Sequence, residues 1–499
     1  MRVTLISPRI AVQKGDFLGS GVPYWPVELA VLAAYLPSRG DDVSVIDLFG
    51  SDPRRLVDRG DYYLQGTPPE ELLRTPAVTE ADAFILYAIS YMSHEDLLGI
   101  AALLKRVRPG ASVAILENSQ AVTAYSIERL SESFFSAGVD GLICGEACFN
   151  WDEIRTWLES PRKRRPPDNV ISRWRPAGGP VRRRMERLAS YPIPAWEKFP
   201  VRGYWSLPYS HGPKTGTYLP ILASRGCPYP CDFCVVPETN DRRWRERRPV
   251  EVVDEIISLR DRFGVRHFQV EDLNPTVRSA YWAEISRLLL ERSAKIYFYF
   301  VSGTKAETVP LDQVPLLARA GCRYISISPE SGSREVMKQI GKPFDYDHGL
   351  KLVRACREQG IRTQACFLVG HPAETPETHE ESRRYLQEMV RSGLDEVAVF
   401  IVAPFAGSDL HTESAIALSD DDALPSFSPR GRDDFSVLQR RRRELIRVFF
   451  LEKLKKGLDL WLQGLRAILG RPQTKMENLP RRMLFITSLI RRRRRSERA

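Results

Sequence analysis

Two blocks of this chain alternate short apolar runs with amphipathic helical stretches. The blocks span residues 1–158 and 216–410, and residues 159–215 between them are rich in Pro, Arg and Trp. Alternation of this kind predicts parallel sheets whose strands are joined by helices. We therefore expect an α/β chain of two domains with a linker between them, followed by a helical, basic carboxy-terminal region over residues 411–499.

The first block predicts a Rossmann-like, doubly wound sheet. Its expected strands are RVTLISP, DVSVIDL, AFILYAIS, SVAILE and GLICGE, and VELAVLAAYLPSRG is an expected helix. Ligands of such sheets bind at the carboxyl ends of the strands. Those ends are expected at Ser7–Pro8, Ser90–Tyr91, Glu117–Gln120 and Cys144–Glu146.

The second block predicts a partial TIM-like barrel of six strand–helix units. Its expected strands are YLPILASRG, HFQVEDLNP, KIYFYFVSG, CRYISISPESGS, RTQACFLVGHP and EVAVFIVAP. Catalytic groups of such barrels gather at the carboxyl ends of the strands. Polar residues follow several of these runs, so we expect a site at that edge.

Three cysteines follow the first strand of this barrel. Cys227, Cys231 and Cys234 form the pattern C-x3-C-x2-C. Soft thiolates packed this closely suit an iron–sulfur cluster. A 4Fe–4S cluster normally takes four thiolates, and no fourth cysteine lies nearby, so one iron would stay open to a small molecule.

Zinc and disulfide bonds are the alternative explanations for these cysteines. Structural zinc sites usually take four ligands in two pairs, and no other cysteines supply a matching pair. These are Cys144, Cys148, Cys322, Cys356 and Cys366. Disulfides require an oxidising compartment, whereas MRVTLISPRI has no signal-peptide apolar region. The spacing therefore favours a cluster.

The composition predicts a globular protein of the cytoplasm. No stretch approaches the roughly 18 uninterrupted apolar residues of a membrane span. The formal charge of +10 would attract anionic lipid or nucleic acid. Because the chain has no helix-turn-helix, zinc-finger or stacking-aromatic motif, we expect no specific nucleic-acid partner.

The cysteine loop resembles the signature of the radical S-adenosylmethionine (SAM) enzymes, with Phe233 directly before the last cysteine. In that family the open iron chelates SAM, and the reduced cluster cleaves it to a 5′-deoxyadenosyl radical. The resemblance implies a 4Fe–4S cluster on the three cysteines and SAM beside Phe233. It also implies an electron donor such as flavodoxin or ferredoxin.

Further motifs of the second block resemble those of the same family in the same order. Glu271, Asp272 and Asn274 resemble its F-x-D-D-x-F pattern, and Glu330 and Ser331 begin a match to E-S-G-S. The resemblance implies that Asp272, Asn274, Lys305, Glu330 and Ser331 contact SAM, with Gly332 allowing close approach of its backbone to the ligand. Lys342 matches another family position, and His371 is either an acid–base group or a structural loop residue.

The first block resembles the cobalamin-binding domain of class B radical SAM enzymes, because four features follow one another in the same order. These are a first strand ending in Ser-Pro, the segment PYWPVELAVLAAYL, the segment VIDL, and Gly-Glu after the fifth strand. The family commonly has Gly-Gly after the fourth strand, where this chain has Glu117–Gln120, and the D-x-H-x-x-G motif is absent. Cobalt would then lack a protein histidine, or the domain would not bind cobalamin. The cobalamin contacts that the resemblance implies are Ser7, Pro8, Ser90, Asn118, Ser119, Gln120, Gly145 and Glu146.

The carboxy-terminal region predicts amphipathic helices from Arg440 onward. Apolar residues recur every three to four positions at Ile446, Phe449, Phe450, Leu454, Leu458, Trp461, Leu465 and Ile468. We expect this face to cover the open side of the partial barrel. The alternative is a basic amphipathic helix on an anionic membrane surface, helped by Arg491–Arg495, which would suit a lipid-like substrate.

Together these features predict a cobalamin-dependent radical SAM enzyme, most simply a C-methyltransferase acting at an unactivated carbon of a small or lipid-like molecule. The alternative is a radical SAM cyclase, oxidase or rearranging enzyme without net methyl transfer. A cluster-bearing binding protein is the third hypothesis, and it predicts no SAM cleavage. The sequence assigns no catalytic residue beyond the cofactor contacts.

Overall fold

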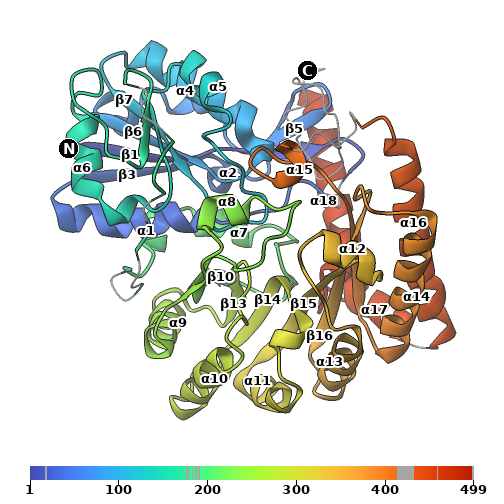
Figure 1. Ribbon diagram of the computed structural model, residues 1–499. Coiled ribbons are helices and arrows are strands. Elements are labelled where there is room, and N and C mark those ends of the chain that lie inside the picture. The colour runs from blue at the N-terminus through green and yellow to red at the C-terminus, as the bar shows by residue number, and fades with distance from the viewer. Residues whose placement is uncertain are drawn as a thin grey trace.

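The computed structural model describes residues 1–16, 19–175, 179–182, 184–185, 188, 191–412, 432–457 and 459–496. Three parts of the sequence predictions lie outside the described residues. These are residues 413–431 of the predicted helical region, the predicted apolar position Leu458, and the side chains of Arg494 and Arg495. Two large sheets organise the described residues, one in each predicted block (Figure 1).

The first sheet is the predicted Rossmann-like sheet. Its order is β3-β1-β6-β7-β8-β9, and all neighbours are parallel except β8 and β9. The strands are β1 (Arg2–Ser7), β3 (Asp42–Asp47), β6 (Ala83–Ala88), β7 (Ser112–Glu117), β8 (Gly141–Ile143) and β9 (Val170–Ser172). The helices are α1 (Val27–Tyr35), α2 (Leu48–Ser51), α3 (Pro76–Thr79), α4 (His94–Val107), α5 (Ser131–Ser136) and α6 (Trp151–Leu158).

Two parts of this domain differ from the sequence prediction. Strand β9 lies in the predicted linker and pairs with β8, because a three-residue edge strand shows no alternation that a pattern search can detect. A small antiparallel sheet, β2 (Ile10–Gln13), β5 (Tyr62–Gln65) and β4 (Leu56–Asp58), also lies beside the main sheet.

The second sheet is the predicted partial barrel. Its strands pair in chain order and all in parallel, and β10 and β17 at its two edges do not pair with each other. The strands are β10 (Tyr218–Ile221), β13 (His267–Val270), β14 (Tyr297–Thr304), β15 (Cys322–Glu330), β16 (Arg362–Val369) and β17 (Glu396–Ile401). The helices between them are α9 (Pro249–Phe263), α10 (Tyr281–Glu291), α11 (Val314–Ala320), α12 (Arg334–Gln339), α13 (Tyr346–Glu358) and α14 (Pro376–Ser392).

The carboxy-terminal helices cover the side of the barrel that its sheet leaves open. Helix α16 (Phe435–Lys455) packs on α14 and β17. The first turn of α18 (Lys475–Ser496) reaches the barrel, where Lys475 donates to the carbonyl of Val301 at 3.0 Å. Further along α18, Arg482 stacks over Tyr209, just before β10, and Leu489 packs against the small sheet. In the described residues no helix is long and apolar enough to cross a membrane.

The two domains meet along their strand ends. The amide of Gly226, at the start of the cysteine loop, donates to Gln120 of the first domain at 3.2 Å. The amide of Ser126 donates to the carbonyl of Ala406 in the second domain at 2.8 Å. Short elements of the second domain complete this seam: β11 (Ser224–Arg225), α8 (Val236–Asn240), β12 (Arg245–Glu246) and α15 (Asp409–Thr412). The carboxyl edges of both sheets therefore face one another.

Candidate active site at the domain interface

The three cysteines lie on one loop between β11 and α8, at the seam of the two domains. Cys231 is buried, and Cys227 and Cys234 are half-buried. The loop begins at Gly226, whose φ of 80° and close approach to the carbonyl of Arg243 leave no room for a side chain. Within the described residues no three His, Cys, Asp or Glu side chains converge to hold a single metal ion. A cluster with several irons differs, because each thiolate binds its own iron.

The charges around this loop suit a thiolate-bound cluster. Burial raises the pKa of all three thiols, that of Cys234 to about 12, and the nearby ammonium group of Lys342 lowers them. Lys342 is buried and pairs with Glu330 at 2.6 Å. Binding of thiolates to iron replaces the protons that burial would otherwise retain. The donor set and its cation therefore fit the cluster that the sequence predicts.

His371 and Asp232 hold the cysteine loop in position. The Nε2–H of His371 donates to Asp232 at 2.8 Å, and its Nδ1 accepts from the amide of Ala373 at 3.1 Å. Asp232 also donates its amide to Ile340 at 3.2 Å and accepts from Leu410 at 3.1 Å. Because both nitrogens of His371 are engaged within the protein, the structure supports the structural alternative for this histidine.

The predicted SAM contacts Asp272 and Asn274 take different positions. The buried carboxylate of Asp272 accepts from the amides of Ala223 (3.0 Å) and Ser224, and from the hydroxyl of Ser224 at 2.5 Å. It therefore fixes the chain just before the cysteine loop, where the sequence predicted a contact to the SAM ammonium group. Asn274 lies at the cysteines, since its side chain helps to lower the pKa of the Cys227 thiol against the effect of burial.

The remaining predicted SAM residues surround the loop. Lys305 pairs with Glu307 at 2.8 Å and lies 4.8 Å from the ring centroid of Tyr229, between the first two cysteines. Phe233 is partly buried against the main core. The backbone of Glu330 has a φ of 58°, at a point where the β15–β16 register shifts.

The E-S-G-S segment is shaped by helix α14. The hydroxyl of Ser331 bonds the hydroxyl of Ser382 at 3.0 Å and accepts from the amide of Ser333 at 3.1 Å. A Cβ atom on Gly332 would lie 2.5 Å from the carbonyl oxygen of Glu381. The glycine therefore admits the backbone of α14, and the close approach of its backbone to a ligand stays a prediction.

The residues predicted to contact cobalamin divide into two groups. Asn118 and Gln120 line a cavity between the domains, and Ser119 accepts from Asn240 at 2.7 Å. The others do not line this cavity. Ser7 and Pro8 are buried after β1, and Ser90 accepts from the amide of Met92 at 3.3 Å. Gly145 donates to Glu117 at 2.9 Å, and Glu146 pairs with Arg245 at 2.6 Å.

The loop that replaces the expected glycines connects the two domains. Asn118 donates to the carbonyl of Ile89 at 2.7 Å, and Gln120 donates to Asn240 at 3.3 Å. Gln120 also accepts the amide of Gly226. These side chains therefore occupy the edge where a corrin ring would approach.

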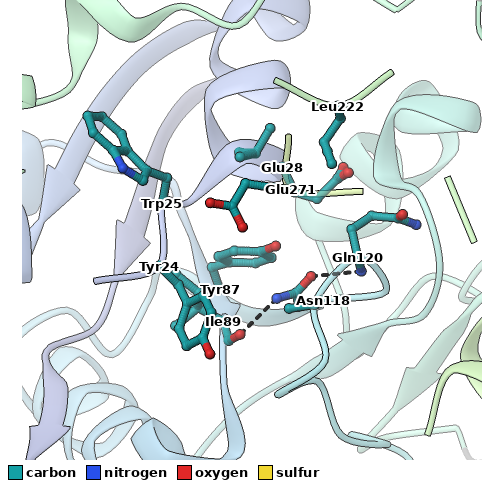
Figure 2. A pocket seen from close by; sticks show the side chains of 11 residues that line it. Tyr24, Trp25, Glu28, Tyr87, Ile89, Asn118, Gln120, Leu222 and Glu271 are labelled. Carbon is teal, nitrogen blue, oxygen red and sulfur yellow. Dashed lines mark hydrogen bonds between the residues drawn. The ribbon is translucent and has the colours of Figure 1, made fainter. Parts of the chain in front are cut away.

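The cavity has a volume of about 30 Å³, which is room for a few water molecules. Figure 2 shows Tyr24, Tyr87, Glu28 and Glu271 on its walls together with Asn118 and Gln120. Its polar walls can accept hydrogen bonds. In particular, one carboxylate oxygen of Glu271 accepts from His211 at 2.6 Å, and its other oxygen, which is buried, has no partner among the described residues.

Sequence reasoning missed the charged residues that join the domains. Glu28 pairs with Arg225, and Arg225 lies 3.6 Å from Glu146. Burial would raise the pKa of Glu146, but Arg225 and Arg245 outweigh it and hold this pKa below its ordinary value. The sequence could have indicated Arg225, which lies two residues before Cys227. It could not have indicated Glu28 or Glu146 as its partners, because both are remote from it in the sequence.

The comparisons with known proteins agree with this geometry. Residues 221–411 match the radical SAM superfamily model. The cytidylyl-2-hydroxyethylphosphonate methyltransferase of Streptomyces wedmorensis is 24% identical over 427 residues, which cover 78% of this chain and 77% of that protein. The anaerobic magnesium-protoporphyrin IX monomethyl ester cyclase of Rubrivivax gelatinosus is 28% identical over 196 residues, which cover 38% of this chain and 34% of the cyclase.

Two solved structures share the fold. The radical SAM methyltransferase TsrM of Kitasatospora setae, with tryptophan and a SAM analogue, aligns with a TM-score of 0.61 at 18% identity. The alignment covers 82% of this chain and 75% of TsrM. The cobalamin-dependent SAM radical enzyme OxsB, with aqua-cobalamin and SAM, aligns with a TM-score of 0.64 at 15% identity, covering 98% of this chain and 80% of OxsB.

The cysteine loop on a partial barrel, together with the family match, makes this chain a radical SAM enzyme, which uses a 4Fe–4S cluster, SAM and a reductant. The chain shares with TsrM and OxsB a fold in which a Rossmann-like domain precedes the barrel.

Proposed function

We propose that this protein is a cobalamin-dependent methyltransferase that acts at an unactivated carbon of a small molecule. The match to a methyltransferase over 78% of the chain, with Rossmann-like domain and barrel present together, is the observation that carries this proposal. The cluster and SAM would supply a 5′-deoxyadenosyl radical, and cobalamin would supply a transferable methyl group. Both cofactors' reactive atoms must then lie near one substrate carbon.

The residues of the chain hold and shield this site. Cys227, Cys231 and Cys234 would bind the cluster, while Lys342 places a positive charge beside it. Asn274, Lys305 and Glu330 surround the loop and are the proposed SAM contacts, with Ser331 and Phe233 nearby. Asp272 and His371 act as positioning residues, because their hydrogen bonds fix the loop from both sides.

The cavity is the proposed site of cobalamin and substrate. Its amide and carboxylate groups complement a ligand that carries amide groups, as the corrin side chains do. A corrin ring is far larger than this space of about 30 Å³, so binding requires the side chains of Asn118 and Gln120 to move or the domains to separate. The polar walls favour a substrate with hydrogen-bond donors over a plain hydrocarbon.

A second candidate function is a radical rearrangement or ring closure without net methyl transfer. The side chains of Asn118 and Gln120 at the cavity edge favour it, because they crowd the approach of a corrin ring. The partial match to the anaerobic cyclase supports the same reading. A low-potential protein such as flavodoxin or ferredoxin would supply the electron in both cases.

The test uses the anaerobically purified, reduced enzyme with SAM whose methyl group is deuterated. Wild type should form 5′-deoxyadenosine, and candidate substrates, beginning with polar small molecules, should gain one labelled methyl group by mass spectrometry. Cys231→Ala should lose the cluster and deoxyadenosine formation while its circular dichroism stays that of wild type. Deoxyadenosine formation with an unlabelled, rearranged product would instead establish the second candidate, and activity in Cys231→Ala would refute both.

A further inference from the structure

Helix α17 (Asp459–Ile468) turns its apolar side to solvent. Trp461 and Ile468 are 73% and 84% exposed, and Leu462, Leu465 and Leu469 are exposed as well. Spacings of one, four and seven residues from Trp461 place Leu462, Leu465 and Ile468 on one face of the helix, and Leu469 follows directly after its end. A row of large apolar side chains on a monomer surface indicates an interaction site.

The face that α17 packs against the protein is polar or small. Gln463 is buried and donates to the carbonyl of Asp395 at 3.0 Å, and Ala467 is buried beside it. An amphipathic helix of a globular protein normally buries its apolar stripe. The reversed arrangement means that the exposed apolar face takes no part in the core.

Basic residues surround this helix. At its amino end Lys456 lies within electrostatic reach of Arg354, Arg357 and Arg391. At its carboxyl end are Arg471 and Arg481, which are exposed. Acidic residues compensate only part of this charge, since Asp459 pairs with Arg357 at 3.2 Å and Glu477 with Arg466 at 2.7 Å. Arg354, Arg471 and Arg481 form no ion pair with the residues that the structure describes.

We propose that α17 is an interfacial helix that docks this protein on an anionic lipid surface. An exposed Trp and aliphatic side chains on one face, with Lys and Arg at the rim, are the features that bury shallowly in a lipid headgroup layer. A second copy of the chain fits less well. A two-fold contact through this face would bring two basic rims together, and like charges oppose such a contact.

This surface lies away from the catalytic edge. Gln463 bonds the residue before β17, and Gln473 bonds Arg362 at the start of β16, so α17 lies at the amino ends of these strands (Figure 1). The cysteine loop lies at the carboxyl end of the barrel. Lipid docking therefore goes beyond the proposed reaction, and changes in α17 should leave SAM cleavage intact.

Vesicle flotation with the full-length enzyme tests the proposal. Wild type should float with phosphatidylcholine vesicles that contain phosphatidylglycerol, and much less with phosphatidylcholine alone. High salt should weaken the binding. The double variant Trp461→Ser/Ile468→Asp should reduce partitioning about tenfold or more, and Arg471→Glu/Arg481→Glu should reduce it on anionic vesicles.

Leu290→Asp is the matched control, because Leu290 is also exposed, at 40%, but lies on α10 outside this surface. It should float like wild type, and all variants should still form deoxyadenosine. The proposal is overturned if wild type stays in solution with anionic vesicles, or if the α17 double variant floats as well as Leu290→Asp. A dimer seen by sedimentation that the same double variant dissociates, without vesicle binding, would assign the face to a second copy instead.

Discussion

Lys342 acts on the environment of all three cysteines. It is a buried cation paired with Glu330, and its charge lowers the pKa of all three thiols against the effect of burial. A fixed positive charge favours the more negative, reduced state of a nearby cluster. The pair therefore contributes both to stability and to the ease of reduction.

Replacing Lys342 with Met should separate these two contributions. The change leaves Glu330 buried without its partner, which should cost about 3–5 kcal/mol of unfolding free energy. The double variant Lys342→Met/Glu330→Gln should recover much of that stability. In both variants the midpoint potential of the reconstituted cluster, measured by electron paramagnetic resonance titration, should be more negative than in wild type. An unchanged potential would contradict the electrostatic role.

Asp272 makes stability depend on pH. Burial raises its pKa from 3.8 to about 6, although its hydrogen bonds from Ser224 and Ala223 oppose this. The folded state then holds a proton that the unfolded state has released. The contribution of Asp272 to stability is therefore greatest below about pH 4, falls as pH rises, and is lowest above about pH 6, a change on the order of 3 kcal/mol.

Asp272→Asn should remove this pH dependence. The apoprotein of the variant should be less stable overall, because an amide nitrogen cannot accept the bond from a backbone amide. Between about pH 4 and pH 6 its unfolding free energy should fall less steeply than that of wild type. Parallel denaturant titrations at several pH values measure the difference, and identical slopes would show that the carboxyl is ionised throughout.

At the level of elements, the E-S-G-S segment and α14 form a tight contact that the sequence motif alone does not explain. Gly332→Ala should destabilise the protein by about 1–3 kcal/mol, because the new methyl group would overlap the backbone at Glu381. Gly99→Ala in α4 is the control, since nothing lies near its Cβ position. Thermal unfolding of the two variants should differ clearly, and equal melting temperatures would show that α14 can shift freely.

The regular elements were predictable because their patterns are local. Apart from β9, the strands of both sheets follow from apolar runs, and the helix end at Gly40 follows from a glycine in the left-handed conformation. Strand β9 was not predictable, because it is too short to show periodicity. The position of α18 against the barrel was not predictable either, because it depends on contacts with remote segments such as Val301. The same reason hid the pairing of Arg225 with Glu28.

The candidate site was predictable only in part. The cysteine spacing predicts the cluster loop, and the residues Asn274, Lys305 and Lys342 that the motifs singled out lie near that loop. The motif for Asp272 found the right place but a different role, since its carboxylate is directed to the backbone. Sequence spacing does not reveal which way a side chain at a strand end will point.

For the molecule as a whole, the two domains form one site through charges shared across their seam. Glu28 and Glu146 of the first domain meet Arg225 and Arg245, which flank the cysteine loop of the second. Buried charge networks of this kind favour one arrangement of partners over others. The cavity with Asn118, Gln120 and Glu271 on its walls lies at the same seam. A cofactor in the first domain would thereby face the cluster.

The cobalt content of the enzyme, purified without oxygen from cells supplied with cobalamin, tests this account most directly. Iron, sulfide and cobalt should be measured on the same sample together with its ultraviolet–visible spectrum. The account predicts a full 4Fe–4S cluster and one equivalent of cobalamin per chain. A full cluster with SAM cleavage but no cobalt would contradict it, and would show that the first domain serves the radical site without carrying a cofactor.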